Sequence, residues 1–135
     1  MKASPKLSQI HQCPCCSGKP FARCCARFLI QQQTPKTAEQ LMRSRFSAYY
    51  LGGFGEYLLS SWHPATAGEL TALQLSVKTQ DWQRLVLLSK SQQGDKAQVE
   101  FKAFYLEGQQ LKVMHENSQF VRLAGRWLYL GGEVS

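Results

Sequence analysis

Apolar and polar positions follow two different periods along the chain, and the change falls near Trp82. In residues 37–53, TAEQLMRSRFSAYYLGG, apolar positions recur at the spacing of one helix face, which predicts an amphipathic helix. Thr37 can cap its first turn, with Gln40 three residues later as in a capping box, and the closing glycine pair can end it. The first part of the chain is therefore predicted to be helical.

Two shorter helices are predicted after this segment. The first is GEYLLSSW, residues 55–62, which should end at His63 because Pro64 pushes the residue before it out of helical geometry. The second is GELTALQLS, residues 68–76. Upstream, the polar residues 31–37 have the composition of a linker.

From Trp82 onward, runs rich in branched and aromatic residues are separated by the turn sequences QQGD, EGQ and AGR. Four antiparallel strands joined by hairpins are predicted, over residues 82–91, 96–107, 109–123 and 126–132. Alternation in the second strand separates Val99, Phe101, Ala103 and Tyr105 on one face from Glu100, Lys102, Phe104 and Leu106 on the other. Helices followed by a strand meander predict an α+β fold in which the sheet curls over the helices.

The third predicted strand contains a conflict of parity. Leu111 and Val113 share a face that Phe120 does not. Because successive strand residues point to opposite faces, this pattern predicts a bulge or bend near Asn117.

Length and composition fit one core with a small appendage. The chain has 135 residues, of which 44% are hydrophobic, enough for one packed domain. We divide it into an N-terminal segment, residues 1–33, and an α+β domain, residues 34–135. No apolar run is long enough to span a membrane, and the start MKASPKLSQIHQ lacks the apolar stretch of a secretory signal. We therefore expect a cytoplasmic protein.

The net charge of +7 is unevenly placed. Residues 1–38 contain no acidic residue, and their basic residues are Lys2, Lys6, Lys19, Arg23, Arg27 and Lys36. One interpretation is a surface for an acidic protein or for nucleic acid phosphates. The other is that Lys19, Arg23 and Arg27 neutralise nearby thiolates. The sequence leaves both interpretations open.

All five cysteines lie within residues 13–25, CPCCSGKPFARCC. Such crowding in a reducing compartment favours metal binding over a disulfide framework. A C-x-C pair and a later C-C pair can supply the four soft ligands of a tetrahedral Zn²⁺ site. These ligands are Cys13, Cys15, Cys24 and Cys25. Cys16 is an alternative ligand, because C-P-C-C also contains a C-x-x-C pair, and His11 can replace a cysteine. Without Zn²⁺ the segment should be disordered, because its apolar residues are few.

CPCCSGKPFARCC resembles the SEC-C zinc motif at the C-terminus of the preprotein translocase ATPase SecA. The resemblance implies the same four ligands, and Cys16 stands where that motif has glycine. In SecA the motif recognises an acidic export chaperone, which implies an acidic partner.

Three further segments, LMRSRFSAYYLG, YLLSSWHPAT and HENSQFVRLAGRWLYLGG, resemble the bacterial YchJ family in sequence and in order. In that family a SEC-C motif precedes a nuclear transport factor 2-like (cystatin-like) domain. The resemblance implies a cone of helices packed on a curved antiparallel four-stranded sheet. The interior of such a cone is an active site in some families and plain core in others, so the fold alone does not assign a function.

No catalytic motif such as G-x-S-x-G, a Walker loop or H-E-x-x-H is present, so catalysis has no support from motifs. The polar residues that can face a cavity are Arg43, Arg45, His63, Glu100, His115 and Glu116. The ordinary interpretation of the two arginines is a solvated helix face that carries an ion pair. That of His63 is a partner for the carbonyls at a helix end. Because His115 and Glu116 are adjacent on a strand, at most one of them faces inward.

Two functions from different classes fit these features. The leading hypothesis is a binding or adaptor protein, in which a zinc-stabilised basic arm recognises an acidic protein surface or nucleic acid. The strand aromatics Phe101, Tyr105, Trp127 and Tyr129 can stack on bases, although such stripes are more often core. The alternative is a small enzyme or small-ligand-binding protein that uses a cavity lined by Arg45, His63 or Glu100.

Overall fold

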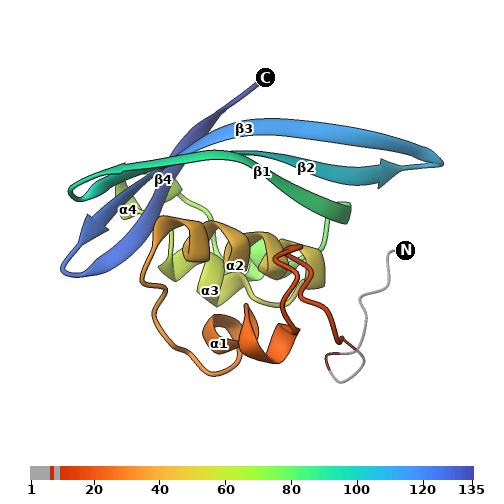
Figure 1. The fold of residues 1–135 in the computed structure, drawn as a ribbon, viewed down its shortest axis with the longest axis horizontal. Coiled ribbons are helices and arrows are strands. Elements are labelled where there is room, and N and C mark those ends of the chain that lie inside the picture. The colour runs from red at the N-terminus through yellow and green to blue at the C-terminus, as the bar shows by residue number, and fades with distance from the viewer. Residues whose placement is uncertain (1–6, 8–9) are drawn as a thin grey trace.

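In a computed structural model, which describes Leu7 and residues 10–135, short helices lie against one face of an antiparallel sheet (Figure 1). The helices are α1 (Ala26–Leu29), α2 (Ala38–Leu51), α3 (Gly55–Ser60), α4 (Pro64–Ala67) and α5 (Ala72–Ser76). The strands are β1 (Asp81–Gln93), β2 (Lys96–Glu107), β3 (Gln110–Leu123) and β4 (Arg126–Val134). This arrangement confirms the predicted α+β fold and its four strands. Lys2 and Lys6, counted in the basic N-terminal segment, lie outside the described residues.

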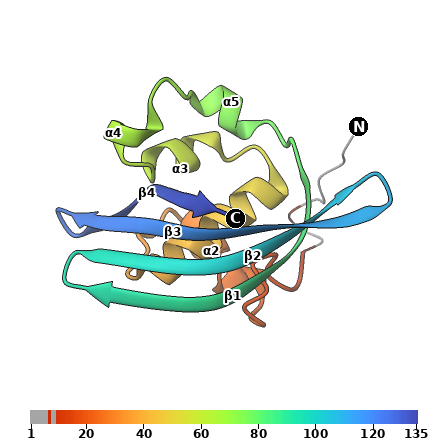
Figure 2. The ribbon, with the colours of Figure 1, turned by 90° about the horizontal axis from the view of Figure 1, so that it is seen from above.

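The sheet is a meander in the order β1-β2-β3-β4 (Figure 2). Each hairpin turn has a residue with positive φ, at Gly94, Gly108 and the pair Ala124–Gly125, as tight two-residue turns require. The three predicted turns, at QQGD, EGQ and AGR, are therefore confirmed as the hairpin connections. The β2–β3 hairpin extends beyond the helices (Figures 1 and 2).

Alternation in β2 is as predicted, because Val99, Phe101 and Ala103 are buried on the face that meets the helices. The predicted bulge near Asn117 is wrong, because β3 pairs with β2 without a register shift. Leu111 and Val113 are instead exposed on the outer face.

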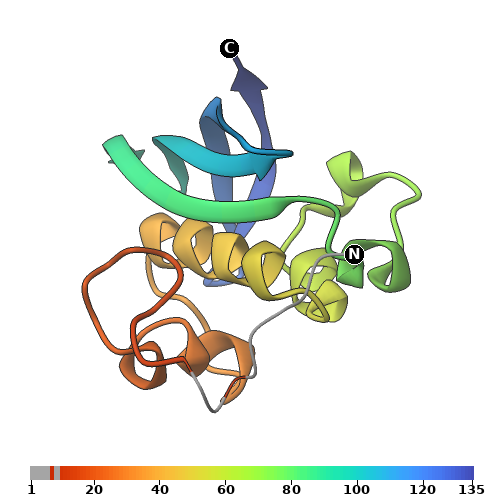
Figure 3. The same ribbon diagram turned by 90° about the vertical axis from the view of Figure 1, so that its right-hand side faces the viewer.

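The register shifts lie in the outer strands. On β4, Leu130 is the extra residue, since Gln119 pairs with Gly131 and Phe120 with Tyr129. On β1, Gln83 and Leu88 are extra. Such bulges bend the strands that carry them, and Figure 3 shows the sheet curving over α2.

Helix α2 is the centre of the molecule, between the sheet and the N-terminal segment (Figures 1 and 3). Its buried residues therefore extend around most of the helix, where the sequence predicted a single apolar face. Thr37 caps it as predicted, accepting a hydrogen bond from Gln40 N at 3.1 Å. The Gln40 side chain does not complete a capping box, because its Oε1 accepts from Lys36 N.

Helix α3 lies beside α2, α5 packs against α3, and α4 contacts β4. At Gly55 a Cβ would lie 1.7 Å from the carbonyl oxygen of Ala72, so only glycine allows α3 and α5 to approach this closely. Pro64 ends one segment as predicted, but it also occupies the first turn of α4, a position that proline favours. None of the helices in the described ranges is long and apolar enough to cross a lipid bilayer.

Candidate metal centre and cavity

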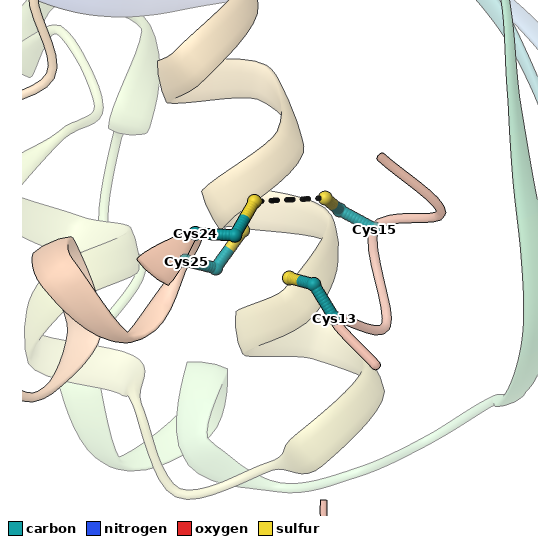
Figure 4. A group of neighbouring side chains, drawn as sticks. All are labelled: Cys13, Cys15, Cys24 and Cys25. Carbon is teal, nitrogen blue, oxygen red and sulfur yellow. Dashed lines mark hydrogen bonds between the residues drawn. The ribbon is translucent and has the colours of Figure 1, made fainter. Parts of the chain in front are cut away.

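Residues 10–33, which we call the knuckle, bring two pairs of cysteines together (Figure 4). Cys13 and Cys15 lie in a turn closed by the hydrogen bond from Cys13 N to Lys19 O at 3.0 Å. Cys24 and Cys25 follow a single 3₁₀ turn, Phe21–Arg23, and precede α1. All four side chains are buried, and their sulfur atoms lie within 4.8 Å of one another. Four sulfur atoms at this separation can hold one metal ion.

The thiols of this cluster influence one another strongly. Hydrogen bonds from Cys15 and Cys25 lower the pKa of Cys13 to about 4, although burial opposes this shift. A hydrogen bond from Cys25 lowers the pKa of Cys24 to about 6. The same hydrogen bonds, together with burial, raise the pKa of Cys25. The four sulfur atoms thus share a few protons through hydrogen bonds, and a divalent cation can bind in place of these protons.

Cys16 and His11 lie outside this cluster. Cys16 is exposed and has a φ of +64°, a conformation that glycine adopts most easily. That conformation explains why a motif of this type has glycine at the position. The Cys16 sulfur accepts a hydrogen bond from Leu85 N at 3.5 Å and so faces β1. His11 is an exposed residue.

The knuckle is docked on α2 by polar contacts. Arg43 Nη1 donates to the carbonyl oxygen of Cys15 at 2.8 Å, and its Nε donates to Glu39 at 2.9 Å. Ser47 Oγ lies 3.7 Å from the sulfur of Cys13. Arg43 therefore carries an ion pair, as its ordinary interpretation expected, but it lies neither on a solvated face nor in the cavity. The knuckle is part of the packed core, in which its four buried cysteines share one cluster with the sheet residues.

The basic residues of the knuckle divide into two groups. Arg27 is half-buried, donates from Nε to the Cys24 carbonyl at 3.0 Å and lies over the Phe28 ring. Lys19 and Arg23 are exposed. Arg27 therefore supports the local backbone, whereas Lys19 and Arg23 face solvent.

A second candidate site is a cavity of about 250 Å³ between α2 and the inner face of the sheet. Most of its wall is apolar, contributed by Met42, Phe46, Trp82, Phe101, Ala103, Met114 and Phe120. Thr79 is the one exposed residue of the lining, so the cavity reaches the surface beside it. The interior of the cone is therefore hollow.

Arg45 is the cationic group in the wall of this cavity. It is only 5% exposed, which contradicts its expected place on a solvated helix face. Nη1 donates to Leu58 O and to Ser61 Oγ, both at 2.7 Å. The guanidinium also lies over the rings of Trp62 and Tyr129, at 4.9 and 4.5 Å. Burial lowers the pKa of Arg45, so an anionic partner would stabilise it.

Glu116 is the anionic group of the same wall. Its Oε2 accepts hydrogen bonds from Ser118 Oγ and, at 3.0 Å, from Tyr129 OH. Burial and the neighbouring Glu116 raise the pKa of Tyr129, so its hydroxyl stays a donor. On β4, Gly132 leaves space for this side chain, since a Cβ there would lie 2.5 Å from Glu116 Oε2.

The other expected cavity residues lie elsewhere. His63 caps α4, where its Nδ1 accepts from Ala65 N at 3.0 Å; the expected contact with carbonyls at a helix end is wrong. Glu100 and His115 pair at 2.7 Å on the outer face of the sheet. Of the neighbours His115 and Glu116, one alone faces inward, as predicted. Sequence reasoning missed Ser118 and Tyr129 as partners of Glu116, although Ser118 shares its strand parity.

The aromatic residues proposed as a stacking platform belong to the core. Phe101 and Trp127 are buried, and Tyr129 packs against the core cluster. Trp62 completes this region, with its ring 5.2 Å from that of Tyr129 and its buried Nε1 without a hydrogen-bond partner among the described residues. Phe101, Trp62 and Tyr129 therefore line the cavity, whereas Trp127 is buried outside its lining. Tyr105 is half-buried and packs edge-on against Trp82.

Comparison with known proteins places these features in a group. The family model described as YchJ, middle NTF2-like domain, matches residues 37–132. A UPF0225 protein from Sodalis glossinidius is 39% identical over 126 residues, which cover 89% of this chain and 81% of the relative. A UPF0225 protein from Ralstonia nicotianae is 38% identical over 144 residues, and the alignment covers 99% of this chain and 99% of the relative.

Two solved structures have the same fold. The solution structure of a SEC-C motif containing protein from Rhodopseudomonas palustris has a TM-score of 0.80 and 31% identity, covering 90% of this chain and 96% of that one. The crystal structure of a SEC-C motif containing protein from Psychrobacter arcticus has a TM-score of 0.77 and 28% identity, covering 94% of this chain and 83% of that one.

Proposed function

The chain belongs to the YchJ (UPF0225) family, and from that premise we propose that it is a zinc-binding protein whose knuckle contacts an acidic protein partner. The observation that carries the metal proposal is the buried group of four sulfur atoms within 4.8 Å. Within the described part of the chain this group consists of cysteines alone. An all-thiolate, closed tetrahedral set is typical of structural Zn²⁺.

The role of zinc in this proposal is to hold the knuckle on α2. Cys13 and Cys15 belong to one turn and Cys24 and Cys25 to another, so one ion bound to all four would join the two turns. The sulfur of Cys13 and the carbonyl of Cys15 both contact α2 residues. A bound ion would therefore also fix the surface that the knuckle presents.

The acidic partner is inferred from the charge of that surface. Residues 10–38 contain no acidic residue, and Lys19 and Arg23 are exposed on the knuckle. The two solved relatives are SEC-C motif containing proteins, in agreement with the resemblance of this segment to the SecA motif. An acidic protein segment suits the surface better than nucleic acid does, because the exposed cations are few and Phe21 and Phe28 are buried.

Paired charge reversals test this proposal. Binding of a fluorescent poly-glutamate peptide to the zinc-loaded full chain is measured by anisotropy, in low and raised salt. The double variant Lys19→Glu and Arg23→Glu should weaken binding about tenfold or more, and salt should weaken it in the wild type. The control, Lys96→Glu and Lys112→Glu, makes the same change of net charge on exposed strand residues and should have a much smaller effect.

An equal loss of peptide affinity in the two double variants would show that binding depends only on net charge. That result would overturn the proposed surface. Single-stranded RNA that binds more tightly than the peptide and responds to the same knuckle variants would identify nucleic acid as the partner instead. A negative result would count against the acidic partner alone, because zinc binding is tested by a different measurement.

A further inference from the structure

The cavity under the sheet contains two opposite charges that are not paired with each other. Arg45 and Glu116 both line it, yet no ion pair joins them within 4.0 Å among the described residues. Both side chains are at least nine-tenths buried. A buried charge that lacks an opposite partner is costly, because it has lost its hydration without a full replacement.

Each charged group is held by the protein on one side and left open on the other. Arg45 uses Nη1 for both of its hydrogen bonds, so Nε and Nη2 have no hydrogen-bond partner in the part of the chain that the structure describes. Glu116 uses Oε2 for both of its hydrogen bonds, and Oε1 has none there. Two residues that line one cavity thus have a donor pair and an acceptor without a partner among the described residues.

The two charged groups share one aromatic neighbour, Tyr129. The Tyr129 ring lies 4.5 Å from the Arg45 guanidinium carbon, and its hydroxyl donates to Glu116 at 3.0 Å. One aromatic side chain therefore contacts both charges. A ligand that carries both a carboxylate and an ammonium would supply each of the two charges with an opposite partner.

The rest of the cavity fits an apolar body. Its volume of about 250 Å³ exceeds the roughly 150 Å³ that encloses a benzene molecule in an apolar protein cavity. Phe46, Trp82 and Phe101 contribute aromatic surface, and Met42 and Met114 contribute flexible side chains that adapt to shape. The site as a whole is neutral, so it favours a ligand without net charge.

We propose that this cavity binds a small zwitterion with an apolar side chain, of the size of a hydrophobic α-amino acid. The ligand carboxylate accepts hydrogen bonds from Arg45, the ammonium donates to Glu116 Oε1, and the side chain occupies the aromatic part. This inference is independent of the metal and of the acidic partner.

Three probes with the same apolar body test the charge requirement. L-Phenylalanine carries both charges, 3-phenylpropionate lacks the ammonium, and phenethylamine lacks the carboxylate. Each is titrated into the ¹⁵N-labelled, zinc-loaded full chain at concentrations up to about 10 mM, which reveals dissociation constants near 1 mM. L-Phenylalanine should bind about tenfold or more tightly than the other two, and the largest shifts should fall on inner-face residues such as Trp62 and Trp82.

A conservative variant and a matched control locate the charge effect. Glu116→Gln keeps an acceptor for Ser118 and Tyr129 but removes the charge, so it should weaken L-phenylalanine and phenethylamine about tenfold and leave 3-phenylpropionate unchanged or tighter. Glu100→Gln makes the same change on the outer face of the sheet and should alter none of the three affinities. The proposal is overturned if no probe saturates, if all three bind equally, if 3-phenylpropionate binds the wild type best, or if Glu100→Gln matches Glu116→Gln.

Discussion

Glu39 connects three parts of the molecule through one carboxylate. Its Oε1 accepts from Lys90 Nζ on β1 at 2.7 Å, and its Oε2 accepts from Arg43 Nε at 2.9 Å. Arg43 in turn binds the carbonyl of Cys15 in the knuckle. The hydrogen bond from Lys90, with that from Arg43, holds the pKa of Glu39 below its ordinary value of 4.5, although partial burial opposes this shift.

Glu39→Gln tests the consequence for stability against pH. Because the pKa of Glu39 is lower in the folded state, the ionised carboxylate stabilises the fold above the unfolded pKa, and this contribution is lost as the pH falls through the folded pKa. The variant should be less stable than the wild type at neutral pH, and the difference should shrink below pH 4.5. Urea unfolding across this range measures it.

Glu69→Gln is the control for that series, since Glu69 is exposed and makes no ion pair with a described residue. Glu69→Gln and the wild type should lose metal equally in acid, so metal loss cannot produce a difference between them. A Glu39→Gln deficit that stays constant or grows in acid would contradict the assigned role.

Arg43 and Arg45 show what could and could not be predicted for single residues. They lie two positions apart, so an α-helix turns them to nearly opposite faces. The sequence does not say that both faces of α2 are covered, one by the knuckle and one by the sheet. The sequence also did not show whether Glu116 faces inward, because the apolar residues Leu111 and Val113 of its strand lie on the outer face.

At the scale of elements, caps differ in importance with the burial of the helix that they begin. Thr37 caps the buried α2, and Thr71 caps α5, in which no residue is buried. Thr37→Ala should cost about 1 kcal/mol of global unfolding free energy, the usual value for a lost hydroxyl cap. Thr71→Ala should cost clearly less, because α5 can fray without unfolding the core. Equal losses in urea unfolding would contradict this ranking.

The strands were predicted well because their signal is local. Period-two alternation and the glycine-containing turns are read from neighbouring residues, and they located all four strands. The short α4 was missed, since Pro64 was taken only as the end of the preceding segment. The bulge was misplaced to β3 because apolar Leu111 and Val113 were expected on the inner face, whereas they are exposed on the outer face. The extra residue lies on β4, opposite Gln119 and Phe120.

At the scale of the whole molecule, α2 is the common wall of the knuckle and the cavity. One face carries Arg43 and Ser47 toward the cysteines, and another carries Arg45 and Phe46 toward the cavity. Besides its four cysteines, the knuckle contributes Phe21, Ala26 and Leu29 to the core cluster, whereas the sheet is held by three antiparallel hairpin ladders. Metal binding typically contributes about 10 to 16 kcal/mol to small zinc modules. The knuckle should therefore depend on zinc far more than the sheet does.

Hydrogen exchange with and without a chelator tests this difference. Removal of zinc should speed exchange at knuckle amides such as Cys13 N and Cys16 N, which donate to backbone carbonyls within the turn. Amides in the central strands β2 and β3 should keep most of their protection. Loss of protection that is equal in the knuckle and the strands, or absent from both, would contradict a knuckle that depends on zinc more than the sheet does.

The most direct test of the metal centre is X-ray absorption at the zinc edge on purified full-length protein. A four-cysteine site should contain one zinc per chain, with a shell of four sulfur atoms at about 2.3 Å. The spectrum should be unchanged in Cys16→Ser and altered in Cys15→Ser. Absence of stoichiometric zinc, or a wild-type shell that contains nitrogen or oxygen, would contradict the four-cysteine site.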